Sequence, residues 1–223
     1  KNIYSPFPEE VNRRITSIIS SYHFSPTSIA KKNLINEGIN KERVYVIGNT
    51  VIDAILSVSK KLDQDQNKFY KYFKNNYGIE FTKRKSILLT VHRRESIGQG
   101  LENICYAIKE LSKNKKIQII APVHLNPNVQ KPLMSNLSNI DNVFLIPPQD
   151  YVPFVFIMKN SHLILSDSGG VQEEAPSLGK PVLVLRNNTE RPEAVNAGSA
   201  KLVGTDPSLI ISNVNSLVQD EPL

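Results

Sequence analysis

The sequence has almost no cysteine, no long apolar run and no leader-like start. Cys105 is the single cysteine in 223 residues, which excludes a disulfide framework and the paired spacing of a zinc site. No stretch approaches the roughly 18 apolar residues of a membrane-spanning helix. The first residues also lack the basic start and apolar core of a signal peptide. These absences predict a cytoplasmic location and no membrane partner.

Aromatic residues are sparse as well, and this limits what the positive charge means. The chain carries 27 Lys and Arg against 21 Asp and Glu, a net charge of +6. Nucleic-acid surfaces interleave basic residues with stacking aromatics, whereas the Phe and Tyr residues here fall mostly within apolar segments. Nucleic acid is therefore not expected as a partner, while a net positive field would attract an anionic small molecule.

From residue 43 onward, short apolar runs alternate with amphipathic stretches. The strands that this pattern predicts are 43–48, 86–91, 116–122, 142–147, 162–167, 181–186 and 200–204. The helices that it predicts are 50–60, 65–76, 99–112, 127–137, 151–160, 169–178, 190–197 and 206–219. Regular alternation of this kind implies an α/β fold with a mostly parallel sheet and helices on both faces. Because ligands of such sheets lie at the carboxyl ends of the strands, the loops after the strands are the informative ones.

The first 42 residues do not follow this alternation. They predict two helices, at 8–20 and 28–37, on either side of the short segment YHFSP. We therefore divide the chain into 1–42, a helical piece, and 43–223, a Rossmann-like domain. Either the two helices pack on that domain, or they are the end of a preceding one.

The strongest local signal begins at residue 166, where the sequence reads SDSGGVQEEAPSLGKPVLVLRNNTERPEAVNAG. The apolar strand HLILSD ends at the turn Ser168-Gly169-Gly170, and two glycines let a ligand approach the backbone closely. The start of the following helix suits a diphosphate, and Glu173 and Glu174 in its first turn suit ribose hydroxyls. The alternative is an ordinary strand-to-helix turn whose acids only favour the helix N-terminus.

Histidines at two strand ends form a second signal. His92 directly follows a predicted strand and precedes Arg93 and Arg94, which places cationic groups at the ligand-bearing end. These groups suit phosphates; alternatively, Arg93 pairs with Glu95 on the surface and His92 is a satisfied buried residue. His124 repeats the arrangement one strand later, where a structural role before a helix cap is an equal alternative.

An amide, an aromatic ring and an arginine complete the candidate set. Gln149 follows a strand and Phe154 lies in the next turn. An amide matches the imide edge of uracil, and a ring matches its flat face. Arg191, flanked by Glu190 and Glu193, suits ribose or phosphate, or else pairs with a neighbouring carboxylate.

Eight segments follow one another in a specific order: SPFPEEVNR, YHFSPT, GNTVIDA, HRRESIG, PVHLNPNV, PQDYVPF, SDSGGVQEEAPSLGKPVLVLR and TERPEAVNAG. In this order, and nearly from end to end, the chain resembles the non-hydrolysing UDP-N-acetylglucosamine 2-epimerases. The resemblance implies the C-terminal Rossmann-like domain of a two-domain, glycosyltransferase-B-type fold. It also implies interconversion of UDP-N-acetylglucosamine and UDP-N-acetylmannosamine, by elimination of UDP across C1 and C2 and its re-addition.

The resemblance further implies roles for individual residues. It implies that the UDP portion is bound by His92, Gln149, Phe154, Ser168, Gly169, Gly170, Glu174 and Arg191. It makes Glu9 and His92 catalytic, and Arg93 with His124 a second, regulatory UDP-N-acetylglucosamine contact. No metal or cofactor is expected. The expected partners are UDP-N-acetylglucosamine and UDP, and the full-length protein is expected to be a homodimer.

Several segments that the family has are absent from this sequence. It lacks the N-terminal strand-turn with an arginine and a lysine, the Gly-Asp-Thr aspartate and the His-Val-Glu-Ala-Gly glutamate. Residues 1–42 then correspond to a remnant of the N-terminal domain, and Glu9 is the one catalytic carboxylate left. We therefore expect the chain to bind UDP without epimerising it. The alternatives are a UDP-sugar-binding remnant without catalysis and a glycosyltransferase of the same architecture.

Overall fold

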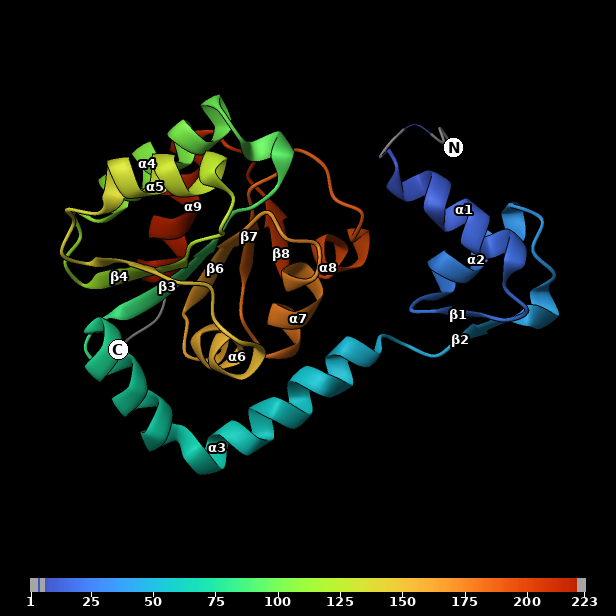
Figure 1. Cartoon of the computed structure of the whole chain (residues 1–223), viewed down its shortest axis with the longest axis horizontal. Helices are drawn as coiled ribbons and strands as arrows, with labels where there is room; N and C mark the ends of the chain where they lie inside the picture. The colour runs from blue at the N-terminus through green and yellow to red at the C-terminus, as the bar shows by residue number, and fades with distance from the viewer. Residues whose placement is uncertain (1–3, 5–6, 220–223) are drawn as a thin grey trace. The chain divides into compact units, whose positions relative to one another are not determined.

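The computed structural model describes residues 4 and 7–219, and the chain divides into two compact units, Lys1–Asp53 and Ala54–Leu223. The larger unit is built on a parallel sheet (Figure 1). Its strands are β3 (Lys85–Thr90), β4 (Ile117–Pro122), β5 (Val143–Ile146), β6 (Leu163–Ser166), β7 (Val182–Val184) and β8 (Ala200–Leu202).

The order of these strands places a switch point in the middle of the sheet. The order is β5-β4-β3-β6-β7-β8, and all neighbouring strands are parallel. The chain therefore runs outward from β3 to one edge, returns to β6 beside β3, and runs outward to the other edge. In open α/β sheets, ligands bind outside the carboxyl ends of the strands at such a point.

Helices cover both faces of this sheet (Figure 1). Side chains of α4 (Gln99–Leu111), α5 (Pro127–Leu137) and α9 (Pro207–Gln219) pack on one face. Those of α3 (Thr50–Tyr77), α6 (Tyr151–Lys159), α7 (Val171–Ser177) and α8 (Pro192–Asn196) pack on the other. Alternate side chains of β3 point to opposite faces of the sheet: Ile87 packs in the first helix layer and Leu88 in the second. The predicted α/β fold, with a parallel sheet and helices on both faces, is confirmed.

An aromatic cluster joins α6 to α3. The ring of Phe156 stacks on Phe73 at a centroid distance of 5.7 Å and on Phe69 at 5.3 Å. It meets the rings of Tyr70 and Phe81 edge-on. The sequence predicted two helices here, at 50–60 and 65–76, and α3 consists of two helical stretches that meet at a kink at Asp65, where the backbone is not helical.

The smaller unit contains a parallel βαβ arrangement. It comprises α1 (Glu9–Ile19), β1 (His23–Ser25), α2 (Ser28–Asn36), a short 3-10 turn (Lys41–Arg43) and β2 (Val44–Val46). The strand predicted at 43–48 was expected to belong with the large sheet, but β2 pairs with β1, and His23 lies opposite Val44. Because β1 supplies its hydrogen-bonding partner, β2 groups with the residues before it. The observed division, after Asp53, therefore falls later than the boundary predicted after residue 42.

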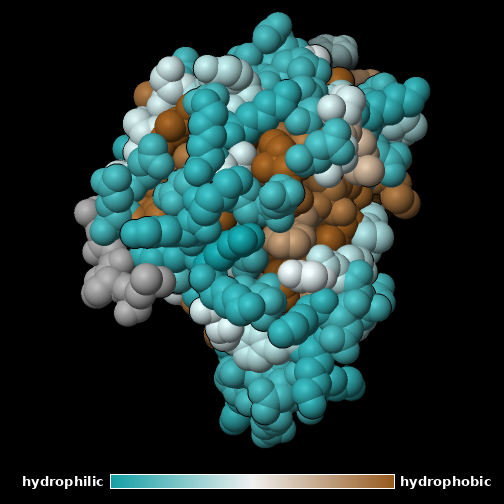
Figure 2. Space-filling view, turned by 90° about the vertical axis from the view of Figure 1, so that its left-hand side faces the viewer, coloured by the Kyte–Doolittle hydropathy of each residue, from teal (hydrophilic) through white to brown (hydrophobic). Residues whose placement is uncertain are grey.

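The surface that Figure 2 presents is covered mainly by hydrophilic side chains, and hydrophobic ones are exposed over a smaller area. None of the helices in the described part of the chain combines the length and the apolar character that a membrane crossing requires.

Candidate functional site

A hollow of about 290 Å³ lies at the switch point of the large sheet. It is lined by Thr90, Val91, His92, Pro122, His124, Pro148, Gln149, Phe154, Ser168, Val171 and Glu174. These residues come from the carboxyl ends of β3, β4, β5 and β6 and from the first turns of α6 and α7. Six predicted site residues are thus brought together: His92, His124, Gln149, Phe154, Ser168 and Glu174.

Asp167, which the sequence analysis did not single out, holds the two central strands of the sheet together. It follows β6, and its side chain is fully buried. Its carboxylate accepts hydrogen bonds from the backbone N–H of His92, at 3.0 Å, and of Arg93, at 2.9 Å. Ser96 donates its hydroxyl at 3.0 Å, and His92 Nδ1 lies 3.2 Å from Oδ1. One carboxylate therefore fixes the whole turn after β3.

Two opposing effects set the pKa of Asp167. Burial raises the pKa, while the hydrogen bonds from the His92 side chain and from the backbone of Arg93 lower it. The hydrogen bonds prevail and hold the pKa below its usual value. Asp167 is therefore an anion at neutral pH.

The hydroxyls of Thr90 and Ser166 add a second link between β3 and β6, with their oxygens 2.7 Å apart. Ser166 Oγ also accepts the backbone N–H of Ser168 at 3.0 Å. The turn after β6 is thereby tied to the strand beside it.

The two histidines lie against each other in the hollow. The rings of His92 and His124 are stacked, with their centroids 5.9 Å apart. His124 Nδ1 accepts the backbone N–H of Asn126 at 3.1 Å, so its Nε2 is the nitrogen that can carry a proton or meet a ligand. The alternative that His92 is buried does not hold, because its side chain is 40% exposed.

Gly169 lies close to the charged side chains of Glu190 and Arg93. A Cβ atom at this position would lie 2.5 Å from Glu190 Oε1 and 3.3 Å from Arg93 Nη2. Glu190 pairs with Arg93 at 3.1 Å and with Arg186 at 2.7 Å. The alternative pairing of Arg93 with Glu95 is wrong, since Glu95 pairs with Arg186 at 2.6 Å.

Arg191 lies outside the lining of the hollow in the described structure. Its Nε forms an ion pair with Glu173, which matches the carboxylate pairing weighed as an alternative for this arginine. Thr189 connects the same loop to α7, because its hydroxyl donates to Gln172 Oε1 at 2.5 Å and accepts the backbone N–H of Arg191 at 3.0 Å. UDP binding by Arg191 stays a prediction.

Gln149 is oriented by two hydrogen bonds. Its Nε2 group donates to the carbonyl of Pro147 at 2.8 Å and to the hydroxyl of Tyr77 at 3.3 Å. Both hydrogens of the amide are thereby engaged, which leaves Oε1 for an imide N–H. Phe154, half-buried in the first turn of α6, lines the same hollow.

Burial raises the pKa of the Glu174 carboxyl, and the neighbouring Glu173 raises it further. Glu174 in turn adds to the effect of burial in raising the pKa of Tyr151. Ionisation of Glu174 therefore costs free energy, and a ligand that donates hydrogen bonds to the carboxylate would offset this cost.

We expect the Glu174→Gln variant to melt about 1 °C higher than the unchanged chain at pH 7 without ligand. A carboxyl whose pKa is raised by folding lowers stability once the pH exceeds its folded pKa, and partial exposure keeps the effect small. At about pH 3.5, where the carboxyl is neutral in both states, the difference should vanish. Thermal unfolding by circular dichroism measures both values. The exposed Asp141→Asn substitution serves as the control, and a lower melting temperature of Glu174→Gln at pH 7 would contradict the expectation.

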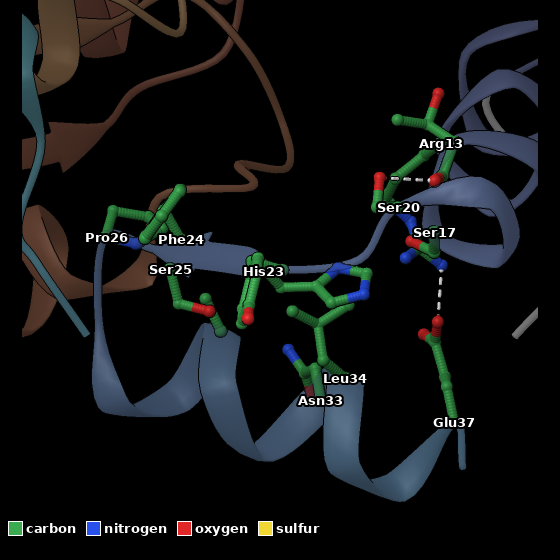
Figure 3. Close-up of a pocket in the computed structure, with 13 residues that line it drawn as sticks. Arg13, Ser17, Ser20, His23, Phe24, Ser25, Pro26, Asn33, Leu34 and Glu37 are labelled. Carbon is green, nitrogen blue, oxygen red and sulfur yellow. Dashed lines mark hydrogen bonds and ion pairs between the residues drawn. The ribbon is translucent and has the colours of Figure 1, made fainter. Parts of the chain in front are cut away.

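A second hollow, of about 480 Å³, lies within the smaller unit (Figure 3). It is bordered by α1, β1 and α2, and two of its lining residues, Arg13 and Glu37, form an ion pair at 2.8 Å. Hydrogen bonds from Arg13 and Arg14 hold the pKa of Glu10 at about 2. Glu9, the predicted catalytic carboxylate, is exposed at the start of α1 and is not among the residues that border this hollow.

The sheet order and the hollow at its switch point define the class: a Rossmann-like α/β protein whose ligand site lies at the carboxyl ends of the strands. The family model of the UDP-N-acetylglucosamine 2-epimerases matches residues 1–222. The chain therefore belongs to the UDP-N-acetylglucosamine 2-epimerase family.

Individual relatives show the same similarity. The chain is 50% identical over 221 residues to the UDP-N-acetylglucosamine 2-epimerase of Escherichia coli K12, covering 99% of this chain and 58% of that protein. It matches the crystal structure of the Neisseria meningitidis UDP-GlcNAc 2-epimerase bound to UDP-GlcNAc with a TM-score of 0.91 and 51% identity, over 98% of this chain and 59% of that one.

The Methanocaldococcus jannaschii UDP-GlcNAc 2-epimerase, in complex with UDP-GlcNAc and UDP, matches with a TM-score of 0.81 and 37% identity, over 99% of this chain and 60% of that one. The family resemblance and the predicted fold class, the C-terminal Rossmann-like domain of a glycosyltransferase-B-type architecture, are confirmed. The chain spans about 58% of the length of the curated relatives it matches.

Proposed function

We propose that this chain binds UDP-N-acetylglucosamine and UDP in the hollow at the switch point, as the UDP-binding part of a UDP-N-acetylglucosamine 2-epimerase. The observation that carries the proposal is the convergence on one hollow of His92, which follows β3, Phe154 from the first turn of α6, and Glu174 from the first turn of α7. The related epimerase from N. meningitidis was crystallised with UDP-GlcNAc, and the one from M. jannaschii with UDP-GlcNAc and UDP.

The uracil base is assigned to Gln149 and Phe154. The engaged amide N–H groups of Gln149 leave its oxygen for the N3–H of the base, and the ring of Phe154 offers a flat face for stacking. The ribose is assigned to Glu174, since a carboxylate accepts hydrogen bonds from the two ribose hydroxyls.

The diphosphate is assigned to His92 and to the turn Ser168-Gly169-Gly170. Elimination of UDP across C1 and C2 of the sugar builds negative charge on the departing diphosphate. Backbone N–H groups at the two glycines and a protonated imidazole would stabilise this charge without reorganising. Arg191 would join them after exchanging its partner Glu173 for the ligand.

Proton transfer at C2 needs groups on both faces of the sugar, because one base cannot remove a proton from one face and return it to the other. Glu9 is proposed as one of the catalytic carboxylates and His92 as the second catalytic group of this chain. The remaining carboxylates of the family belong to segments that this sequence does not contain, so the chain alone is proposed to be inactive.

Three further properties belong to the proposal. His124, stacked on His92, forms with Arg93 a regulatory contact to UDP-N-acetylglucosamine. The full-length protein is a homodimer, as the family resemblance implies. The protein acts in the cytoplasm, which a single, unpaired cysteine suits.

Isothermal titration of the 223-residue chain is expected to show saturable binding of UDP and weaker binding of GDP, because a purine does not fit the amide-and-ring site of a uracil. An assay with UDP-N-acetylglucosamine is expected to show no conversion to UDP-N-acetylmannosamine. A chain that binds neither nucleotide would overturn the proposed site. Steady conversion of the sugar nucleotide would overturn only the proposed inactivity.

A further inference from the structure

The roles proposed above do not use the buried carboxylate of Asp167. Its Oδ2 accepts the backbone N–H groups of His92 and Arg93, at 3.0 and 2.9 Å, and the hydroxyl of Ser96 at 3.0 Å. Its Oδ1 lies 3.2 Å from His92 Nδ1. The buried carboxylate thus contacts both the backbone of the turn after β3 and the imidazole of a residue that lines the hollow.

We infer that Asp167 is a positioning residue, which holds His92 as the Nδ1–H tautomer and so presents Nε2 to the diphosphate of the ligand. The inference rests on the function proposed above. A neutral imidazole has one N–H, and a carboxylate can only accept, so the proton must lie on Nδ1 when that nitrogen contacts Asp167. Protonation of Nε2 then gives an imidazolium that donates to the ligand and is stabilised by the carboxylate behind it.

Other charged groups around His92 do not offer the same contact. The ring of His124 lies face to face with it at 5.9 Å and bonds to Asn126 through its own Nδ1. Glu174 lines the same hollow from α7, and the guanidinium of Arg93 pairs with Glu190. Of the described residues around His92, Asp167 is the one placed to fix the tautomer.

An Asp167→Asn substitution should reverse the tautomer while keeping the size of the side chain. The amide oxygen must take the Oδ2 position, because the backbone N–H of Arg93 and the hydroxyl of Ser96 donate to that atom alone, and the N–H of His92 also reaches it. The amide NH₂ then faces Nδ1 of His92 and donates to it. Nδ1 must give up its hydrogen, and the proton moves to Nε2.

The test is a long-range 1H–15N spectrum of the chain at about pH 8, where imidazoles are mostly neutral. We expect the Nδ1–H pattern for His92 in the unchanged chain and the Nε2–H pattern in Asp167→Asn. His124 gives the Nε2–H pattern in both proteins and serves as an internal reference. Ser96→Ala removes a different contact of Asp167 and is expected to leave the tautomer of His92 unchanged.

Titration with UDP supplies the second readout. We expect the Kd of Asp167→Asn to rise about tenfold, and that of Ser96→Ala to stay within about twofold. An Nε2–H pattern for His92 in the unchanged chain overturns the inference even if Asp167→Asn fails to fold. So does a reversed tautomer in Asp167→Asn with unchanged UDP affinity. Failure of the unchanged chain to bind UDP instead overturns the proposed function, and the spectra still decide the contact between Asp167 and His92.

Discussion

Isothermal titration of the Phe154→Ala variant is expected to show UDP binding about thirtyfold weaker than that of the unchanged chain. Phe154 is half-buried in the first turn of α6 and lines the hollow at the switch point. Stacking of a base on an aromatic ring contributes about 1–3 kcal/mol by alanine substitution, and about 2 kcal/mol corresponds to this factor. The loss should appear with uridine as well as with UDP, because the ring meets the base and not the phosphates.

Val152→Ala is the matched control for this experiment. Val152 belongs to the same turn of α6, is 39% exposed and lies outside the lining of the hollow. Its removal is expected to leave the affinity for UDP unchanged. Equal affinities of Phe154→Ala and the unchanged chain for UDP would show that Phe154 does not bind the base.

Urea unfolding of the Phe156→Ala variant is expected to show a loss of about 4 kcal/mol in the free energy of unfolding. Phe156 is fully buried and stacks on Phe69 and Phe73, so alanine leaves a cavity between α6 and α3. Replacement of a fully buried Phe by Ala costs about 3–5 kcal/mol, because both the transfer energy and the packing around the ring are lost.

The exposed Leu209→Ala on α9 is the control for Phe156→Ala, and its expected loss is below about 1 kcal/mol. Under native conditions, Phe156→Ala should still bind UDP, because its ring does not line the hollow. A loss below about 1 kcal/mol for Phe156→Ala would mean that the space it leaves is refilled. Within α6, substitution of Phe154 is thus expected to weaken UDP binding, and substitution of Phe156 to lower the free energy of unfolding.

The sequence predicted the large sheet well because its inner strands β3, β6 and β7 are buried on both faces. β3 is buried at all positions, so Ile87, Leu88 and Leu89 form a continuous apolar run that can be recognised without knowing its neighbours. The hollow followed from the same reasoning, since residues that directly follow such strands meet at one edge of the sheet.

β1 could not be recognised in this way. Its inward residues are the polar His23 and Ser25, while the apolar Phe24 is 66% exposed. This is the reverse of the alternation that indicates a half-buried strand. Its partner β2 follows only after α2, so the pairing joins segments that are separate in the chain. The sequence of the strand alone does not reveal this pairing.

Asp167 was missed for a related reason. Its partners His92 and Arg93 lie 75 and 74 residues earlier in the chain, and they reach it only because β6 returns beside β3. In the sequence, Asp167 is one more polar residue at the start of a turn. The sequence did not identify Glu173 as the partner of Arg191, because the two residues meet only where the loop before α8 contacts α7.

The links across the switch point also bear on the thermodynamics of binding. The hydroxyl pair of Thr90 and Ser166 and the contacts of Asp167 hold the turns after β3 and β6 in one arrangement before any ligand arrives. The entropic cost of ordering these turns is met when the domain folds, so it does not reduce the free energy of ligand binding. The two turns are therefore preorganised for binding. The affinity of a nucleotide at these turns depends mainly on the contacts that it forms, because little further ordering of the backbone is required.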